Sequence, residues 1–216
     1  MNEWIELLTP SLLETLYMVF VSVFFTILLG LPLGIILVIT REDHILPNSW
    51  LNQILSYMIN ITRSIPFIIL MIFIMPFTRL IVGTTIGTKA VIVPLILATT
   101  PFFARVVESS IKEIDWGVVE AAISMGATPI QIILKVLLPE SMSSLVLGIT
   151  ITIINVLGYS AMAGAIGGGG LGYLAISYGY HRYQTNVMIA TVILLIVLVQ
   201  IIQSTGNKIA QIINKK

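Results

Sequence analysis

The 216-residue sequence contains no cysteine, and only 10% of its residues are charged. The lack of cysteine excludes disulfides, Cys-containing zinc sites and thiol nucleophiles. Soluble domains usually carry about 25% charged residues, so this chain has too few to cover a water-facing surface. Its net charge of +1 leaves no basic face for nucleic acid. Hydrophobic residues instead make up 57% of the chain, which places it in a lipid bilayer.

Motifs for nucleotide binding and catalysis are also missing. No Gly-Lys-Ser/Thr P-loop occurs, and the G-x-G-x-x-G within residues 167–172 follows no predicted strand. We therefore predict a tight, flexible external turn there and not a phosphate site. There is no His-Glu-x-x-His, and residues 158–162 lack the second glycine of a nucleophile elbow, which disfavours an intramembrane enzyme. We expect no catalytic residue, metal site or cofactor in this chain.

Hydrophobic runs predict one all-α membrane domain over residues 1–216, with five transmembrane helices. A helix needs about 20 apolar residues to cross the hydrocarbon core. The first run should remain in the mature protein, because an acidic start without Lys or Arg is the reverse of a signal peptide. Residues 77–88 are predicted to form a short external loop. The spans are expected at residues 12–40, 51–77, 89–107, 141–165 and 187–206.

Charged side chains at the expected span ends have a plain interpretation as anchors. Arg63 would snorkel to the interface while Pro66 loosens the helix that follows, although a functional contact is the alternative. The third span has only 15 uncharged residues between Lys89 and Arg105. It crosses the bilayer if these two side chains snorkel to opposite interfaces.

Residues 115–139 form the longest polar interruption and predict two short helices joined by a sharp turn. Asp115 can cap the first helix, and Gly126 can adopt the positive φ that ends it. Thr128–Gln131 reads as a capping box with proline at the first helical position. Pro139 would end the second helix or bend it into the next. Held between two spans, such a hairpin can sit in a groove of a soluble partner; an ordinary interfacial hairpin is the alternative.

Small and polar residues in the fourth span share one predicted face, because they follow at steps of four, three, four and three. They could cement helix packing, or they could border a translocation path at a dimer axis, and the pattern leaves both open. These residues are Gly148, Thr152, Asn155, Tyr159 and Met162.

Positive charges predict the orientation. Five spans place the termini on opposite sides, and an external N-terminus puts eight Lys and Arg residues inside against three outside. The C-terminus and the 115–139 hairpin are then cytoplasmic. The inside residues are Arg41, Arg63, Arg105, Lys112, Lys135, Lys208, Lys215 and Lys216; the outside ones are Arg79, Lys89 and Arg182.

The spacing of Glu120, Ala121, Ala122, Gly126 and Pro139 resembles the EAA signature of type I ABC importer permeases. In that family this segment is a cytoplasmic coupling helix that docks on the ATPase subunit. The resemblance implies that these five residues couple the chain to the ATPase. Glu120 would offer a charge, Ala121 and Ala122 would allow close approach to the groove, and Gly126 would permit the sharp exit.

Almost the whole chain is similar to the permeases of methionine ABC importers, through residues 63–67, 125–129, 135–140 and 158–162. Val136 departs from the isoleucine that is commoner in the signature. The resemblance implies a homodimeric methionine path in the bacterial cytoplasmic membrane, a homodimeric ATPase subunit that binds ATP, and an extracytoplasmic methionine-binding lipoprotein. A permease for another amino acid or a small peptide is the alternative. An ATP-independent carrier or channel is disfavoured, because such proteins usually place ionisable residues in mid-membrane.

Overall fold

The computed structural model describes residues 2–214, with side chains from Glu6 onward, and this part of the chain is helical with no strand. The described elements are α1 (Asn2–Ile39), α2 (Ser49–Ser64), α3 (Phe67–Phe73), α4 (Met75–Val82), α5 (Thr88–Lys112), α6 (Trp116–Ser124), α7 (Pro129–Ile132), the π-helix η1 (Ile133–Leu137), α8 (Leu138–Gly164), α9 (Gly170–Leu174), the π-helix η2 (Ala175–Tyr180) and α10 (Thr185–Ile213).

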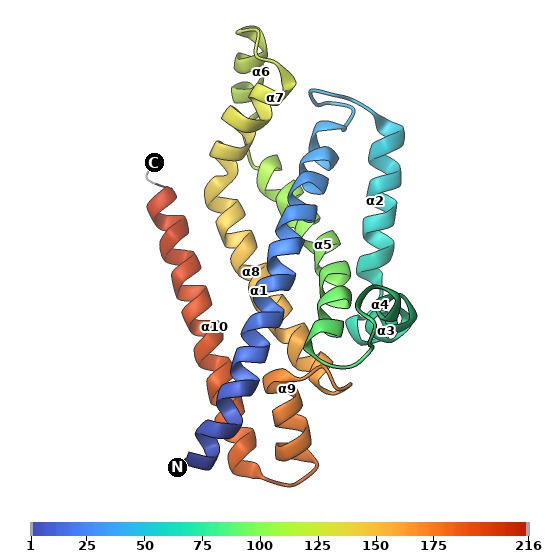
Figure 1. Ribbon diagram of the computed structural model, residues 1–216. Helices are drawn as coiled ribbons and strands as arrows, with labels where there is room; N and C mark the ends of the chain where they lie inside the picture. The colour runs from blue at the N-terminus through green and yellow to red at the C-terminus, as the bar shows by residue number, and fades with distance from the viewer. Residues whose placement is uncertain (1, 215–216) are drawn as a thin grey trace.

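The helices α1, α5 and α8 form the packed centre of the bundle. α10 lies along α8, and α2 to α4 pack against α5 on another side (Figure 1). The short helices α6 and α7 lie at one end of the molecule, while the N-terminus and α9 lie at the opposite end (Figure 1). The bundle therefore separates a hairpin end from an end that carries the glycine-rich turn.

Two glycines allow α1 to approach α5 closely. A Cβ added at Gly34 would lie 2.5 Å from Val107 Cβ and 2.6 Å from the Ala104 carbonyl oxygen, and one at Gly30 would lie 2.9 Å from the Phe103 ring. Small residues let membrane helices approach in this way. The backbones are consequently near enough that larger side chains could not be added without moving a helix.

The predicted second span is broken. α2 and α3 are long and apolar enough to cross a membrane only when taken together, and they meet at an angle of 101°. The break precedes Pro66, because proline disfavours helical backbone at the residue before it; Ile65 is extended, with φ −88° and ψ 124°. Four described helices are individually long and apolar enough to cross a membrane, or up to five if the bent pair counts as one.

The predicted loop at residues 77–88 is mostly helical. α4 occupies its first part and ends at Gly83, which takes a φ of 82°. Only residues 83–87 connect α4 to α5. Apolar residues in Met75–Val82 make this segment a short helix that packs on α5 and not an open loop.

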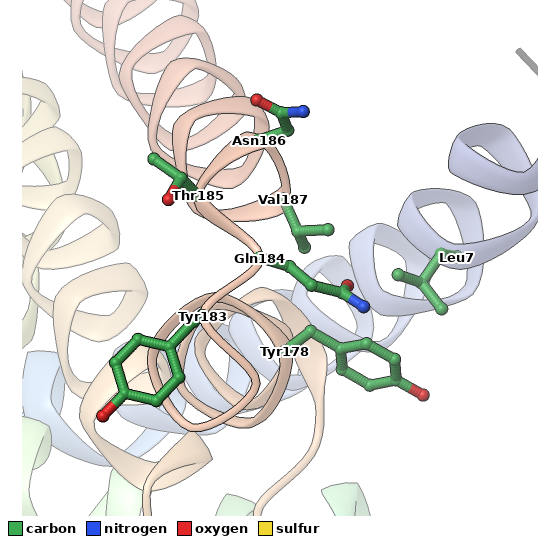
Figure 2. Close-up of a pocket in the computed structure, with 7 residues that line it drawn as sticks. All are labelled: Leu7, Tyr178, Tyr183, Gln184, Thr185, Asn186 and Val187. Carbon is green, nitrogen blue, oxygen red and sulfur yellow. The ribbon is translucent and has the colours of Figure 1, made fainter.

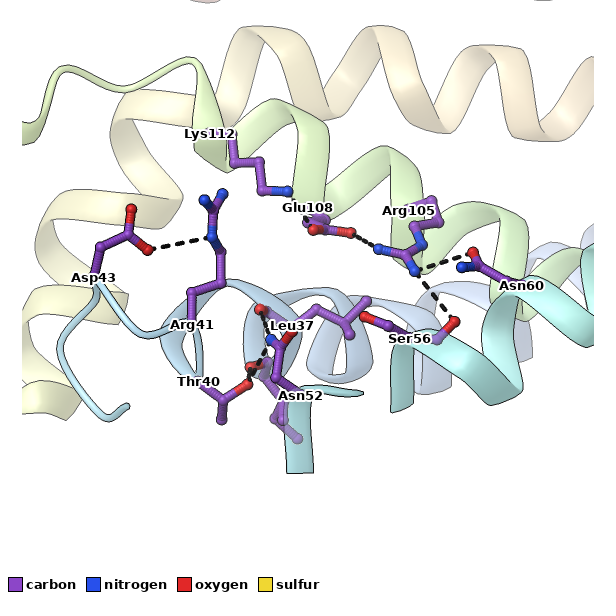
Figure 3. Close-up of polar contacts among 11 residues, drawn as sticks. Leu37, Thr40, Arg41, Asp43, Asn52, Ser56, Asn60, Arg105, Glu108 and Lys112 are labelled. Carbon is purple, nitrogen blue, oxygen red and sulfur yellow. Dashed lines mark hydrogen bonds and ion pairs between the residues drawn. The ribbon is translucent and has the colours of Figure 1, made fainter. Parts of the chain in front are cut away.

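Arg105, which was predicted to snorkel, has hydrogen-bond partners within the protein. It pairs with Glu108 and also donates hydrogen bonds to the Ser56 carbonyl (3.2 Å) and to Asn60 Oδ1 (3.0 Å) on α2 (Figure 3). Glu108 is buried and pairs with Lys112 as well. Partners on its own helix and on α2 thus satisfy the guanidinium within the protein, and its depth in the membrane stays a prediction.

A second polar contact holds α2 against α1. Asn52 Nδ2 donates to the Leu37 carbonyl (2.6 Å) and lies 3.0 Å from Thr40 Oγ1, near the end of α1 (Figure 3). The carbonyls in the last turn of a helix lack intrahelical donors, so a side-chain amide is a suitable partner. α2 is thus tied by hydrogen bonds to both α1 and α5.

The glycine-rich turn is packed and hydrogen-bonded, in contrast to the flexible turn predicted. Gly170 N–H donates to Glu14 Oε2 (2.7 Å) and Leu171 N–H donates to Thr15 Oγ1 (2.8 Å). A Cβ on Gly172 would lie 2.2 Å from the Ala161 carbonyl oxygen. The first amides of α9 therefore already have acceptors on α1.

Replacing Gly34 by alanine should destabilise the α1–α5 contact. The added methyl group would force a helix to shift, and overpacking of this kind costs roughly 1–3 kcal/mol. We expect a lower yield of folded protein and a lower Tm in detergent. Val192→Ile on α10 is the control, since it also adds one methyl group, at a side chain that is 45% exposed. Equal stability of the two variants would contradict the packing argument.

Candidate functional site

The hairpin of α6 and α7 forms through local hydrogen bonds, as predicted. Asp115 Oδ1 accepts the Gly117 N–H at 2.7 Å, and Gly126 ends the first helix with a φ of 81°. In the capping box, Thr128 Oγ1 accepts the Gln131 N–H at 3.4 Å, and Gln131 Oε1 accepts the Thr128 N–H at 2.9 Å. These bonds satisfy backbone donors that a helix start leaves unpaired.

The inner face of the hairpin belongs to the same hydrophobic core as the long helices. Val119 and Ala122 of α6 pack with Ile132 of α7. The cluster continues through Val38 of α1 and Ile111 of α5. Any displacement of the hairpin must therefore displace these helices or open their shared core.

The outer face of the hairpin is exposed and partly apolar. Glu120 and Ala121 lie at the surface, and Met125 and Ile130 are 82% and 68% exposed. Ala122 is only 3% exposed and packs on the inner face of the hairpin, and its part in docking on a partner stays a prediction. Its spacing of three residues from Val119 places it on the inner face. Exposed apolar side chains gathered on a rigid element are typical of a docking surface.

Pro139 does not end the second helix, which was one of the two predicted outcomes; the helix continues into the fourth span. The chain is helical from Pro129 to Gly164 over 36 residues. Within this segment η1 widens the helix, and Leu138 N–H donates to the Ile133 carbonyl five residues back. Proline lacks an N–H and clashes with the carbonyl four residues earlier, which a wider turn accommodates. α7, η1 and α8 thus form one continuous helical arm.

The predicted polar face of α8 divides between the interior and the surface. Gly148 packs on Val106 and Thr152 is fully buried, with its hydroxyl donating to the Gly148 carbonyl. Tyr159 stacks on Phe67 at 4.6 Å between ring centroids. Asn155 is half-buried. Of the five predicted residues only Met162 is clearly exposed, at 47%, so this set as a whole does not form an open face.

An α-helix turns by about 100° per residue. The exposed face of α8 is therefore centred roughly 70° around the helix from the predicted face. Its residues follow at steps of four, seven and four, and each is exposed in the described chain. They are Leu147, Ile151, Gly158 and Met162. Asn155 lies at the edge of this face.

Comparison with known proteins identifies the family. Residues 30–209 match the family described as binding-protein-dependent transport system inner membrane component. The chain belongs to this family. The resemblance found in the sequence is thereby confirmed.

Curated relatives of this inner membrane component carry names from methionine transport. A probable D-methionine transport system permease protein MetI of Vibrio cholerae is 52% identical over 95% of this chain and 92% of its own length. The D-methionine transport system permease protein MetI of Escherichia coli K12 is 52% identical over 73% of each chain. The Vibrio cholerae match therefore covers nearly the whole chain.

Solved structures agree with the family assignment. A chain of the inward-facing MetNI methionine ABC transporter matches all of this inner membrane component, with a TM-score of 0.97 and 48% identity. A chain of an amino acid ABC transporter crystallised with histidines has a TM-score of 0.74 at 20% identity, and it shares the fold. The type I ABC importer fold predicted from the sequence is confirmed.

The loop after α1 contacts the start of α6 in this inner membrane component. The His44 ring meets the Trp116 ring edge-on, at 5.3 Å between centroids. Both rings line a cavity of about 250 Å³ that Arg41, Asp43 and Lys112 also line. Burial lowers the pKa of His44 from its usual 6.5; Arg41 lowers it further, while Asp43 opposes the shift. Protonation at this contact is therefore disfavoured.

Sequence reasoning missed several of these contacts. Glu14 and Thr15 cap α9 from 156 residues away, and no local pattern indicates such a partner. Arg105 and Glu108 do carry a signal, because their spacing of three residues favours an ion pair on one helix. His44 stands alone in the sequence, and only the fold places it beside Trp116.

Stability should fall with acidification through His44. Above about pH 6.5, His44 is neutral in both the folded and the unfolded chain. Below that pH the unfolded chain binds the proton more readily than the folded chain does. The free energy of unfolding therefore falls as the pH falls toward the lowered pKa. We expect His44→Phe to retain the ring contact and reduce the fall in Tm on acidification. His181→Phe, at an exposed histidine, is the control. An unchanged pH dependence in His44→Phe would contradict this assignment.

Proposed function

We propose that this inner membrane component is a permease subunit of an ATP-driven importer and that it forms the transmembrane path for methionine. The match of the entire chain to a chain of the MetNI methionine ABC transporter carries the proposal. The relatives named as D-methionine permeases support it. The path is formed by a homodimer in the bacterial cytoplasmic membrane.

ATP is bound and hydrolysed by a separate homodimeric subunit, since this sequence contains no P-loop. The exposed surface of the hairpin supports docking on such a separate subunit. Glu120 supplies a negative charge, Ala121 a small contact, and Met125 and Ile130 apolar surface at the tip. Gly126 and Pro139 shape the hairpin and its link to α8 and do not themselves provide most of the contact.

The external position of the N-terminus remains our proposal for the orientation. It places the hairpin in the cytoplasm with the ATPase and the glycine-rich turn outside. Figure 1 draws these two features at opposite ends of the bundle, which suits the proposed orientation. The excess of Lys and Arg in the inside segments is its support.

The path runs along the uncovered face of α8, where a second copy of the chain completes the wall. Ile151, Gly158 and Met162 have no cover from their own chain. Asn155 at the edge of this face offers a hydrogen-bonding amide beside the apolar side chains. A two-fold axis would place two such faces opposite each other.

Transport follows alternating access in this proposal. Closure of the ATPase dimer on ATP draws the two hairpins together. Because α7, η1 and α8 form one helical arm, the movement reaches the path-lining face directly. The outward-open state receives methionine from an extracytoplasmic binding protein, and hydrolysis restores the inward-open state.

Replacing Gly126 by valine should uncouple ATP hydrolysis from transport. Gly126 has a φ of 81° with open space around it, so the penalty arises from the backbone and is roughly 1–2 kcal/mol for a residue with a Cβ. Stimulation of the ATPase by loaded binding protein should fall. Gly126→Asn is the control, because asparagine tolerates this conformation. Full stimulation in the valine variant would contradict the coupling role.

Asn155→Leu should reduce methionine uptake by about tenfold, the equivalent of one lost hydrogen bond in the path. Uptake is measured in proteoliposomes that contain the complex isolated with its copurifying ATPase and binding protein. Gln200→Leu makes the same exchange at an exposed position on α10 and should leave uptake unchanged. Normal uptake by an assembled Asn155→Leu complex would remove this residue from the path. Failure of any ATPase to copurify with the wild type would contradict the proposed function itself.

A further inference from the structure

Arg63, near the end of α2, is an exposed cation without a partner. Within the described residues its side chain makes no ion pair and no hydrogen bond. Arg105 and Lys112 differ in this respect, because both pair with the carboxylate of Glu108. The charge of Arg63 is therefore not neutralised by the fold of its own chain.

The sequence also has no carboxylate to offer near Arg63. Residues 44–107 and 141–216 contain neither Asp nor Glu. Glu14 on α1 already accepts the Gly170 N–H, and Glu108 is shared by two other cations. A second copy of the chain has the same distribution of acidic residues, so the counter-charge for Arg63 has to be sought in another molecule.

Arg63 lies deep along a membrane helix. At about 1.5 Å per residue it stands roughly 21 Å along the helix axis from Ser49, the first residue of α2. α2 begins toward the end of the bundle that carries the hairpin (Figure 1), and the hydrocarbon core is about 30 Å thick. After Arg63 the chain turns by 101° and does not continue straight to the opposite surface. This level lies within the hydrocarbon core, where an unpaired charge is costly and points to a function.

A stripe of polar side chains on α2 leads to Arg63. Its members follow at steps of four, four and three, which places them on one face of the helix. They are Asn52, Ser56, Asn60 and Arg63. Asn52 bonds to α1, while the Ser56 carbonyl and Asn60 accept hydrogen bonds from Arg105 of α5. Arg63 continues this stripe by one turn, so it lies on the side of α2 that meets α5.

The neighbouring face of α5 is partly exposed. Its residues follow at steps of four, three and four, and they are Ala98, Phe102, Arg105 and Ser109. On one side of this face, Ala104 shares a hydrophobic cluster with Ile59 of α2. On the other side, Val106 packs against Gly148 of α8. The partly exposed face of α5 therefore lies between α2 and α8.

The chain that follows Arg63 reaches α8 at the edge of its exposed face. Phe67, the first residue of α3, stacks on Tyr159 with ring planes 5° apart. Gly158, next to Tyr159, belongs to the exposed face along which the path is proposed. Arg63, the partly exposed face of α5 and the exposed face of α8 are thus adjoining parts of one wall.

We propose that Arg63 binds the carboxylate of the amino acid as the substrate moves along this wall. A guanidinium presents two parallel N–H donors that match the two oxygens of a carboxylate. It also stays protonated in proteins, so it suits anion binding and cannot relay protons. The inference rests on the proposed function, which supplies a substrate with a free carboxylate. The negative end of the substrate then crosses the hydrocarbon core beside an opposite charge.

The hollow at the end of the molecule opposite the hairpin is less suited to a carboxylate. It measures about 610 Å³, and Leu7, Tyr178 and Gln184 are among the residues that line it (Figure 2). None of its lining residues is charged. The Arg182 guanidinium nearby lies over the Tyr178 ring, 4.2 Å from its centroid. The phenol and amide groups there can hydrogen-bond to a carboxylate, but they offer it no opposite charge.

An interfacial anchor explains Arg63 less well than a binding role does. A snorkelling side chain reaches the headgroups at the membrane surface, whereas the polar stripe turns Arg63 toward α5. Removing Arg63 from the set of inside charges leaves seven Lys and Arg residues against three. The proposed orientation therefore keeps its support.

The test measures the ratio of methionine taken up to ATP hydrolysed, in proteoliposomes that hold the complex with its copurifying ATPase and binding protein. Arg63→Gln should lower this ratio roughly tenfold, because the carboxylate loses a charged hydrogen-bond donor. Arg63→Lys keeps the charge and should retain more of the ratio than Arg63→Gln. Arg63→Glu should lower it further than Arg63→Gln. Arg79→Gln removes an exposed arginine on α4 and should behave as wild type.

A structural role for Arg63 predicts a different pattern. Loss of an anchor lowers the Tm, the uptake and the ATPase activity together, and an unchanged ratio in Arg63→Gln would overturn the proposal. A ratio that does not follow the charge of the side chain, from Lys through Gln to Glu, would also overturn it. If Arg63→Gln does not assemble, Arg63→Met removes the charge while keeping an unbranched stem, and the same loss is expected.

Failure of this inference can be distinguished from failure of the proposed function. A wild-type complex that hydrolyses ATP without taking up methionine would overturn both. Normal wild-type uptake together with equal ratios in Arg63→Gln and Arg79→Gln would overturn the assignment of Arg63 alone.

Discussion

An unpaired backbone amide or carbonyl is unfavourable wherever packing excludes water, and the interruptions of the helices in this protein keep their local hydrogen bonds. At Pro139 the helix widens into a π-turn and continues. At the glycine-rich turn, Glu14 and Thr15 accept the first two amides of α9. Before Pro66 the helix breaks, but Ile65 N–H still bonds to the Thr62 carbonyl. Each break thus changes the direction of the chain while its local hydrogen bonding is kept.

Helix continuity and close packing also determine how the hairpin can move relative to the bundle. Because the arm from Pro129 to Gly164 is unbroken, the hairpin cannot swing without moving α8. Because Val119 and Ala122 share a core with α1 and α5, it cannot slide over these helices without opening packed contacts. Close packing at Gly34 joins α1 to α5 in turn. A push on the outer face of the hairpin is therefore carried by several helices, and coupling needs no flexible intermediary.

The parts of the candidate site that could be predicted from the sequence are those in which partners lie within three residues. Asp115, Gly126 and the Thr128–Gln131 box all formed as expected, since capping depends only on neighbouring backbone. The longer-range contacts could not be read in this way. Arg105 reaches Ser56 across 49 residues, and no local pattern indicates that partner. Pro66 was expected only to loosen the second span, but α2 and α3 meet there at 101°. Both helices pack on α5, and these contacts have no counterpart in the sequence pattern.

By itself the sequence determined that the chain is helical, that it lies in a membrane and that it carries a capped hairpin between two spans. It also determined the resemblance to one transporter family. Composition, caps and motif spacing are local properties, so they can be read without the fold. Only the tertiary structure decided which residues face what. Periodicity correctly placed five residues of α8 near one another around the helix. It could not say that Thr152 would be buried and that Tyr159 would stack on Phe67 of α3 while Ile151 and Gly158 stayed exposed. Helical spacing defines a face, and the identity of the neighbour that covers it depends on how distant segments pack.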